Sequence, residues 1–416
     1  MTALQRPLRF CMVTTFYPPY SFGGDAAYVK RLANALAQRG HQVEVIHCVD
    51  SHRALAGHTS PRPYDDHPNV TVHGLQSRFG ILSPLATQQT GLPLFKSARI
   101  RKILDRGFDV VHYHNVSLVG GPKVLEYGQG VKLYTMHEYW LVCPTHVLFR
   151  YDREPCTERH CLTCTLSYKR PPQWWRYSGA LERAIKQVDL FLAPSRFSME
   201  HHQRLGLQAP IAHLPYFVPA LAANHAAPDT QPADRNEAPY FLFVGRLERL
   251  KGLQTLIPIF RHYDRARLVI AGTGTYEVKL RALAEGIDNV QFVGHLAEQE
   301  LHALYRRAVG LVVPSICYEV SGMVILEAFR QRTPVLVRNL GGMPELARES
   351  GGGIVYSTDA ELVSGLDRLL DDPEYRAQLG EHGHAAYQRL WTTEPHLEGY
   401  FRLIHEIAAR RGLLPG

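Results

Sequence analysis

Short apolar runs alternate along this chain with stretches whose apolar residues recur at helical spacing. Residues 8–14 (LRFCMVT) predict a buried strand, residues 25–38 predict an amphipathic helix, and residues 42–48 predict the next strand. The helix is expected to end at Arg39 and Gly40, a pair typical of helix termini. Such alternation is typical of parallel sheets whose strands are joined by crossover helices.

The same alternation continues in two sets that are separated by a change of composition. Further strands are predicted at residues 70–73, 109–113, 131–136 and 190–193, and then at 240–244, 267–271, 290–293, 310–313 and 334–337. Residues 220–239 are rich in Ala, Pro, Asp and Asn without periodicity, as expected of a linker. We therefore predict an α/β protein with two doubly wound, Rossmann-like domains that face each other across a cleft.

The predicted domain limits follow from these sets. The N-terminal domain is expected at 1–219 and the C-terminal domain at 240–393. Residues 394–416 predict a long amphipathic helix that packs back on the N-terminal domain. Ser195 is placed to cap the helix that follows the strand at 190–193.

Composition narrows the class of protein. A chain of 416 residues with 45% apolar composition is long enough for two cores. No apolar run is long enough to cross a bilayer, and the start of the chain lacks a secretory apolar region, so we expect a cytoplasmic protein. The net charge of +7 would attract phosphates, acidic lipids or nucleic acid, or is simply a basic surface. Without a nucleic-acid module or a Lys/Arg block, nucleic acid is a poor candidate partner.

Two carboxylates follow the predicted strand at 310–313. Glu319 precedes a predicted helix that runs to about Arg330, and Glu327 lies within it. The amides at the start of this helix suit a diphosphate, Glu327 could accept from ribose hydroxyls, and Glu319 could face a transferred group. Charged residues on a solvated helix are the simpler alternative. The residues that lead into the helix are Ser321, Gly322, Met323 and Val324.

Two cations follow the predicted strand at 240–244. Arg246 and Lys251 lie between Gly245 and Gly252, which are expected to form a turn at the carboxyl end of the strand. A guanidinium and an ammonium can neutralise a departing diphosphate without a metal ion. Ordinary surface cations on a loop are the alternative.

These motifs, in this order, resemble the family-4 retaining glycosyltransferases of GT-B fold, over nearly the whole chain. The resemblance rests on the run at 245–252 (GRLERLKG), the Glu pair, the loop at 341–345 (GGMPE) and the N-terminal Gly-Gly loop. It implies that the C-terminal domain binds a nucleotide-diphosphate sugar and that the N-terminal domain mainly binds the acceptor. It also implies transfer with retention at the anomeric carbon and no catalytic metal.

The resemblance assigns roles by position. Arg246 and Lys251 match the diphosphate-binding pair, Glu327 matches the ribose-binding acid, and Glu319 matches the acid that contacts the donor sugar. His137 matches the histidine that reaches the donor sugar beside the reaction centre, although a lone His after a strand is more often structural. The loop that closes on the phosphate is matched by Gly23 and Gly24.

Three positions depart from the family pattern. Val320 and Ser321 stand where Gly-Phe is usual, which could alter how the donor sugar is held. Arg332 stands where Gly is usual after the helix. If Arg332 adopts the left-handed conformation, the cost is on the order of 1 kcal/mol and the chemistry should be unaffected.

Two reaction courses fit these residues. In one, the acceptor hydroxyl attacks the face from which the diphosphate leaves, a phosphate oxygen takes the proton, and preorganised cations carry most of the stabilisation. In the other, an enzyme carboxylate forms a covalent intermediate, as in retaining glycosidases. The sequence does not separate them.

Four of the seven cysteines, Cys143, Cys156, Cys161 and Cys164, fall in a predicted insertion at 143–164. Four thiolates with one Cys-x2-Cys spacing predict a structural zinc site. Free buried thiols, an iron–sulfur cluster and a regulatory disulfide are the alternatives. Similar Cys-rich insertions occur in a subset of the family that this chain resembles.

Residues 168–177 (YKRPPQWWRY) combine Trp with Arg and Lys. This composition suits a peripheral membrane contact or a sugar-stacking surface, and an aromatic lid packed on the core is the alternative.

The leading functional hypothesis is a glycosyltransferase that acts in polysaccharide, glycolipid or secondary-metabolite glycoside synthesis, with a nucleotide sugar as donor and an unidentified acceptor. A sugar-nucleotide epimerase or phosphorylase, and a non-catalytic binding module, are the alternatives.

Overall fold

The computed structural model describes residues 6–56, 65–221 and 238–413. The chain forms two compact units, one made of Met1–Pro215 with Leu397–Gly416 and the other of Tyr216–His396. Each unit is a parallel sheet with helices on its faces, as the alternation of strands and helices predicted.

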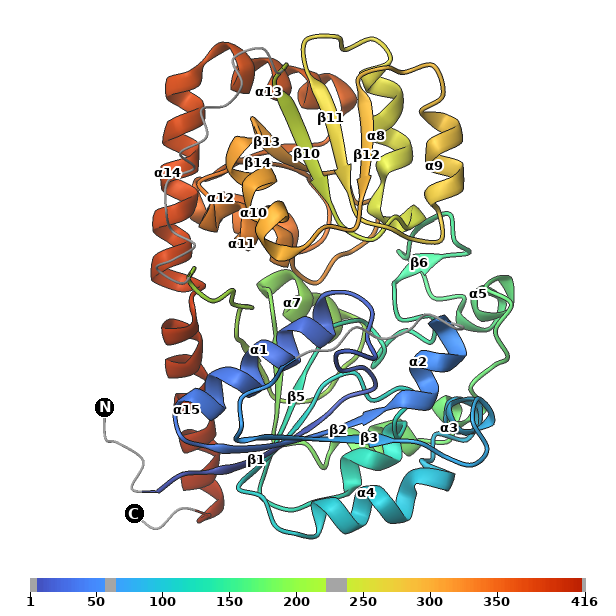
Figure 1. The fold of residues 1–416 in the computed structure, drawn as a ribbon. Helices are drawn as coiled ribbons and strands as arrows, with labels where there is room; N and C mark the ends of the chain where they lie inside the picture. Colours follow the sequence, from blue (N-terminus) through green and yellow to red (C-terminus); the bar gives the residue numbers. More distant parts are fainter. Residues whose placement is uncertain (1–5, 57–64, 222–237, 414–416) are drawn as a thin grey trace. The chain divides into compact units, whose positions relative to one another are not determined.

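The first unit is built on a seven-stranded parallel sheet with the order β3-β2-β1-β4-β5-β8-β9. β1 is an interior strand that pairs in parallel with β2 and β4, with Val13 opposite Ile46 and Tyr113. In Figure 1, α1 lies on one face of this sheet and α4 on the other. The strands are β1 (Arg9–Val13), β2 (Gln42–Cys48), β3 (Val70–Leu75), β4 (Val110–Tyr113), β5 (Val131–Thr135), β8 (Leu190–Ala193) and β9 (Ile211–His213).

Helices and one hairpin complete this unit. Ser195 caps α7 as predicted, because its Oγ accepts the backbone N–H of Ser198 at 3.0 Å. A short hairpin of β6 (Phe149–Arg150) and β7 (Glu154–Pro155), which the sequence pattern did not predict, lies in the insertion. The helices are α1 (Gly24–Gln38), α2 (Val49–Ala56), α3 (Leu82–Thr90), η1 (Leu94–Lys96), α4 (Ser97–Leu104), η2 (Pro122–Glu126), α5 (Cys161–Ser167), η3 (Trp174–Tyr177), α6 (Ala180–Ile185) and α7 (Arg196–Arg204).

The second unit is built on a six-stranded parallel sheet with the order β12-β11-β10-β13-β14-β15. Its strands are β10 (Tyr240–Val244), β11 (Arg267–Ala271), β12 (Val290–Gly294), β13 (Gly310–Val313), β14 (Val335–Arg338) and β15 (Gly353–Tyr356). Its helices are η5 (Arg249–Lys251), α8 (Leu253–Phe260), α9 (Glu277–Leu283), α10 (Glu298–Arg307), α11 (Met323–Arg330), α12 (Met343–Ser350), α13 (Asp359–Asp371) and α14 (Pro373–Leu390). The pattern missed β15 here and β9 in the first unit.

The C-terminal helix α15 (Thr393–Arg411) returns to the first unit, as predicted. The hydroxyl of Tyr400 lies 2.9 Å from His112 Nδ1, and the rings of Tyr400 and Phe401 pack on Phe10 of β1. Near its end, Arg411 pairs with Asp189 at 2.8 Å. Aromatic burial at one end and an ion pair at the other therefore hold this helix on the first sheet.

The boundary between the units differs from the predicted limit at residue 219. The backbone N–H of Val218 donates to Trp391 at 3.0 Å, and its carbonyl accepts from the Tyr387 hydroxyl at 3.0 Å, so the chain joins the second unit from Tyr216 onward. The predicted linker at 220–239 lies mostly outside the described residues.

None of the helices in the described ranges has the length and apolar character needed to cross a membrane.

Candidate active site

The carboxyl ends of β10 and β13 bring a lysine and a glutamate together in the second unit. The two strands pair directly, with Leu242 opposite Leu311, so the loops that follow them are neighbours. Lys251 Nζ donates to Glu319 Oε1 at 2.6 Å, and the Ser315 hydroxyl donates to the same oxygen at 3.0 Å. The sequence singled out the Lys and the Glu but missed Ser315, which orients the carboxylate.

Two glycines hold these loops in place. Gly252 has φ +78°, and a Cβ built there would lie 1.9 Å from the Pro314 carbonyl oxygen. Gly341 has φ +74°, and a Cβ there would lie 2.7 Å from the Glu319 backbone nitrogen. Only glycine combines this backbone conformation with so close an approach, so both positions fix where Lys251 and Glu319 stand.

The loop after β11 packs against the loop after β10 in the same way. A Cβ at Gly272 would lie 1.9 Å from the Gly245 carbonyl oxygen, and one at Gly274 would lie 2.4 Å from the Leu247 carbonyl oxygen. The sequence analysis missed these two glycines, although the run Ala271-Gly-Thr-Gly274 directly after a strand was a readable signal. Close backbone packing of the loops after β10, β11, β13 and β14 thus supports the charged pair.

The cations of this site differ in environment. Arg246 keeps 54% of its side chain exposed and lies 3.6 Å from Glu248, whereas the side chain of Lys251 is 29% exposed. Burial by itself would lower the pKa of Lys251, but the charge of Glu319 and its hydrogen bond outweigh that effect and raise the pKa. Lys251 is therefore a cation throughout the neutral range. Arg246 provides a second cation, whose side chain is more exposed.

The helix α11 begins beside the Glu319 loop, as predicted, and runs from Met323 to Arg330. Its N-cap is Gly322, which provides no side-chain cap, so the amides of the first turn depend on other partners. Ser321 comes just before this cap, and Met323 and Val324 are in the first turn. A Cβ on Gly322 would lie 3.1 Å from Ile325 Cδ1, so there is little space for a side chain at this position.

Glu327 lies in α11 and contacts a different partner from Glu319. The hydroxyl of the buried Tyr305, from α10, donates to Glu327 Oε2 at 3.4 Å. The two glutamates are eight apart in sequence, but one lies in a loop against a lysine and the other on a helix against a tyrosine.

Arg332 adopts the left-handed conformation that the sequence left open. Its φ is 58°, in the left-handed region, directly after α11, and its Nε donates to Glu381 at 2.6 Å. Val320, another of the three departures from the family pattern, is buried.

In the first unit, the glycine loop and His137 are linked through Tyr28. Gly23, with φ 77°, is the N-cap of α1 and Gly24 is its first residue. Tyr28, one turn later, packs edge-on against His137 with ring centroids 5.3 Å apart. The start of α1 therefore lies over the end of β5, where His137 follows the strand.

His137 belongs to a chain of imidazoles. Its Nε2 lies 3.0 Å from His114 Nδ1, and the ring of His114 packs at a tilt against that of His112, with centroids 4.0 Å apart. His112 in turn contacts the hydroxyls of Thr135 at 2.8 Å and Tyr400 at 2.9 Å. Burial lowers the pKa of His137 to about 3, so this imidazole is neutral at physiological pH. Neither His112 nor His114 was predicted, although His112 lies in β4 and His114 directly follows that strand.

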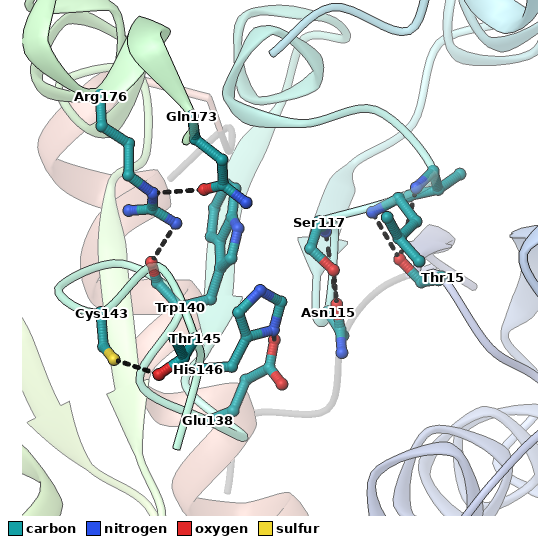
Figure 2. Close-up of polar contacts among 12 residues, drawn as sticks. Thr15, Asn115, Ser117, Glu138, Trp140, Cys143, Thr145, His146, Gln173 and Arg176 are labelled. Carbon is teal, nitrogen blue, oxygen red and sulfur yellow. Dashed lines mark hydrogen bonds and ion pairs between the residues drawn. The ribbon is translucent and has the colours of Figure 1, made fainter. Parts of the chain in front are cut away.

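The segment after His137 is held by contacts on several sides (Figure 2). His146 Nδ1 lies 3.0 Å from Glu138, the Cys143 thiol lies 3.2 Å from the Thr145 hydroxyl, and Arg176 donates to the Trp140 carbonyl at 2.8 Å. Because Glu138 directly follows His137, these contacts fix the backbone that carries the imidazole.

The loops after β1 and β4 are also joined (Figure 2). Thr15 donates its backbone N–H to the Asn115 carbonyl at 2.5 Å, and its hydroxyl accepts from the amides of Leu118 and Val119. Asn115 accepts from the Ser117 hydroxyl at 2.8 Å. Thr15, Asn115 and Ser117 were not predicted, because nothing in their spacing distinguishes them from ordinary loop residues.

The predicted residues thus fall into two groups, one in each unit. The first unit carries Gly23, Gly24 and His137. The second unit carries Arg246, Lys251, Glu319, Ser321, Gly322, Met323, Val324 and Glu327.

The four cysteines of the insertion line one pocket in the first unit. Cys164 Sγ accepts the backbone N–H of Tyr151 at 3.4 Å, and all seven cysteines are free thiols, so the structure contains no regulatory disulfide among them. Within the described ranges, no three His, Cys, Asp or Glu side chains are placed to hold a metal ion. The four cysteines therefore line one pocket but do not form a complete set of metal ligands. The zinc site stays a prediction.

Two sequence families match the chain. Residues 22–220 match the family described as Glycosyltransferase Family 4, and residues 229–386 match Glycosyl transferases group 1. The chain is 29% identical over 412 residues to glycogen synthase of Mycobacterium tuberculosis, with 92% of this chain and 90% of that protein covered.

Solved structures share the fold. Sucrose-phosphate synthase from Thermosynechococcus elongatus superposes with a TM-score of 0.73 at 20% identity, covering 97% of this chain and 100% of that one. Anabaena HepE in complex with UDP-glucose superposes with a TM-score of 0.64 at 15% identity, covering 98% of this chain and 100% of that one. These similarities establish a GT-B arrangement of two Rossmann-like domains.

Proposed function

This chain belongs to the family-4 glycosyltransferases, and from that premise we propose that it transfers a sugar from a nucleoside-diphosphate donor to an acceptor hydroxyl with retention of anomeric configuration. The observation that carries the proposal is the contact between Lys251 and Glu319 at 2.6 Å, next to an exposed Arg246 and the uncapped start of α11. The product would belong to a polysaccharide, a glycolipid or a secondary-metabolite glycoside.

The second unit would hold the donor. Amides in the first turn of α11 and the cations Arg246 and Lys251 would bind the diphosphate, because both offer positive charge to the same group. Glu327 would accept hydrogen bonds from the hydroxyls of the ribose. The HepE complex contains UDP-glucose, which supports a nucleotide sugar as the donor class without fixing its base or its sugar.

The chemistry would depend on positioned charge. As the bond to the anomeric carbon breaks, negative charge develops on the diphosphate, and Lys251 and Arg246 stabilise it where a metal ion would act in other transferases. Glu319 would contact the donor sugar and hold Lys251 in place. The acceptor hydroxyl would attack from the face that the diphosphate leaves, and a phosphate oxygen would take its proton, so no side-chain base is needed.

His137 would contribute as a neutral group. With its pKa lowered to about 3, it can donate or accept a hydrogen bond beside a developing positive charge without adding charge of its own. Gly23 and Gly24 would let the backbone at the start of α1 approach a phosphate closely.

Assays can distinguish the alternative functions from sugar transfer. An epimerase would change the sugar nucleotide without any acceptor, and a phosphorylase would need inorganic phosphate. A non-catalytic module would bind sugar nucleotides without turnover, and the complete set of Arg246, Lys251, Glu319 and Glu327 argues against it.

The test is a turnover screen of nucleotide sugars with candidate acceptors, with and without divalent ions, followed by NMR assignment of the product anomer. Lys251→Ala should reduce transfer at least about 30-fold, since loss of one charged hydrogen bond costs about 2 kcal/mol. Lys279→Ala is the matched control, because Lys279 lies in α9 of the same unit, 5.3 Å from the ring of Tyr276. An inverted product would refute retention, and full activity of Lys251→Ala would refute the site.

A further inference from the structure

Helix α3 has its polar and apolar sides reversed. Ser83 and Thr87 are buried, and their hydroxyls accept hydrogen bonds from the buried ammonium of Lys96 at 2.9 and 3.2 Å. Leu82 and Leu85 of the same helix point outward and are 56% and 47% exposed. A helix on a protein surface usually turns its leucines inward, so this arrangement indicates that the outer side meets something other than water.

The neighbouring segment extends the apolar surface. Trp175 is buried and donates its indole N–H to the Gln88 carbonyl of α3 at 2.9 Å, which anchors η3 beside that helix. Trp174 and Tyr177 of η3 are each 65% exposed. Of the two neighbouring tryptophans, Trp175 therefore packs in the core, whereas Trp174 lies on the surface.

We name this region the α3–η3 face. It consists of exposed apolar and aromatic side chains at α3, η1 and η3 of the first unit, where η1 and η3 both pack on α3. It is defined by Ile81, Leu82, Leu85, Phe95, Trp174 and Tyr177.

The two stretches of sequence that carry the α3–η3 face lack acidic residues. The sequence contains no Asp or Glu between Asp66 and Asp105, and none between Glu158 and Glu182. In the same two stretches, seven Lys and Arg side chains are exposed, namely Arg78, Arg99, Arg101, Lys102, Arg159, Lys169 and Arg170. An apolar patch with cations and no acids is the complement of an anionic lipid surface, in which headgroups carry negative charge above an apolar layer.

We propose that the α3–η3 face docks this protein onto the surface of a membrane that contains anionic lipid. The leucines, Ile81 and Phe95 would enter the boundary between headgroups and acyl chains. Trp174 and Tyr177 suit that boundary because each combines an apolar ring with a polar group. In this arrangement, helix α3 lies on the membrane surface and does not cross the bilayer.

This inference concerns the first unit alone and does not depend on the donor chemistry of the second. Its consequence for the enzyme is that an acceptor carried on a lipid would be presented at the surface where the first unit sits. A protein that docks in this way can still be tested for donor binding in the absence of membrane, so the two proposals fail independently.

The experiment is co-sedimentation of the full chain with vesicles of phosphatidylcholine, with and without phosphatidylglycerol. Wild-type protein should bind the anionic vesicles and lose affinity as salt is raised. Ile81→Glu with Leu85→Glu should reduce binding at least about tenfold, and Lys102→Glu should reduce it by about fivefold or more, as expected for each basic residue near an anionic surface. Trp174→Ser, at a position that is 65% exposed, provides a variant with little risk to folding.

Val278→Glu is the matched control, because Val278 is an 80% exposed apolar residue in α9 of the second unit. It should leave vesicle binding unchanged, and every variant should keep its thermal midpoint and its binding of a nucleoside diphosphate. The proposal is overturned if wild type binds neither vesicle, if the α3–η3 variants bind as well as wild type, or if Val278→Glu weakens binding equally. Light scattering that shows a dimer lost in the double variant, without vesicle binding by wild type, would assign the face to self-association instead.

Discussion

Lys251 Nζ donates to Glu319 Oε1 at 2.6 Å. The cation expected to meet a diphosphate therefore also has a carboxylate partner within the protein. The carboxylate is in turn held by Ser315, so an incoming phosphate competes for the ammonium with a fixed group.

This competition separates the roles of the two residues. Lys251→Ala should weaken nucleoside-diphosphate binding by about 30-fold, because a charge-assisted hydrogen bond worth about 2 kcal/mol is lost. Glu319→Gln should abolish transfer and leave diphosphate binding equal or tighter, because the ammonium no longer has a charged partner. Isothermal titration and turnover of both variants measure this, and equal loss of diphosphate binding in the two would contradict it.

Gly252→Ala and Gly286→Ala change glycines of similar backbone conformation, but we predict that they affect activity differently. Gly252 and Gly286 both have positive φ, +78° and +72°, so Ala costs on the order of 1 kcal/mol of stability at each. Only at Gly252 does the new Cβ meet a backbone oxygen, at 1.9 Å, whereas nothing lies within 4 Å at Gly286. We expect Gly252→Ala to displace Lys251 and lower kcat/KM by about 100-fold, with Gly286→Ala near wild type. Comparable activity of the two variants would show that the loop can adjust.

The buried imidazole of His137 predicts a dependence of stability on pH. Its pKa falls from 6.5 to about 3 on folding, so below pH 6.5 the unfolded chain binds a proton that the folded chain does not. The stability from this group is complete above pH 6.5 and is lost progressively as the pH falls toward 3. His137→Asn should therefore reduce the difference in unfolding free energy between pH 7 and pH 5 by about 2 kcal/mol.

Urea unfolding of the first unit at the two pH values checks this prediction. His202, whose pKa burial lowers to about 4, provides a second variant that should act in the same direction. An unchanged difference in both variants would mean that folding does not lower the pKa of these imidazoles.

The cysteine pocket predicts a metal. Purified protein should contain about one zinc per chain by elemental analysis, and Cys161→Ser with Cys164→Ser should remove it and lower the stability of the first unit. Cys11→Ala is the control, because Cys11 is buried in β1 and does not line the pocket. A metal-free preparation with full stability and activity would end the zinc hypothesis and leave four reduced thiols.

Much of the site was readable from the chain because it depends on strand ends. The strands at 240–244, 267–271 and 310–313 agree residue for residue with β10, β11 and β13, and Arg246, Lys251 and Glu319 follow two of them. Glu319 and Glu327 looked like one pair, yet their partners, Lys251 and Tyr305, are unrelated in sequence position. Spacing along the chain could not separate them, because the difference is made by neighbouring elements.

The sequence by itself determined the two α/β units, the return of the last helix and the positions of most candidate residues. It did so because period-two and helical apolar spacing, and turn glycines, are local properties of the chain. Only the tertiary structure decided that Trp174 is exposed while Trp175 is buried, that α3 turns its leucines outward, and that His112, His114 and His137 form one chain. These features depend on contacts between segments far apart in sequence, whose packing no local pattern specifies.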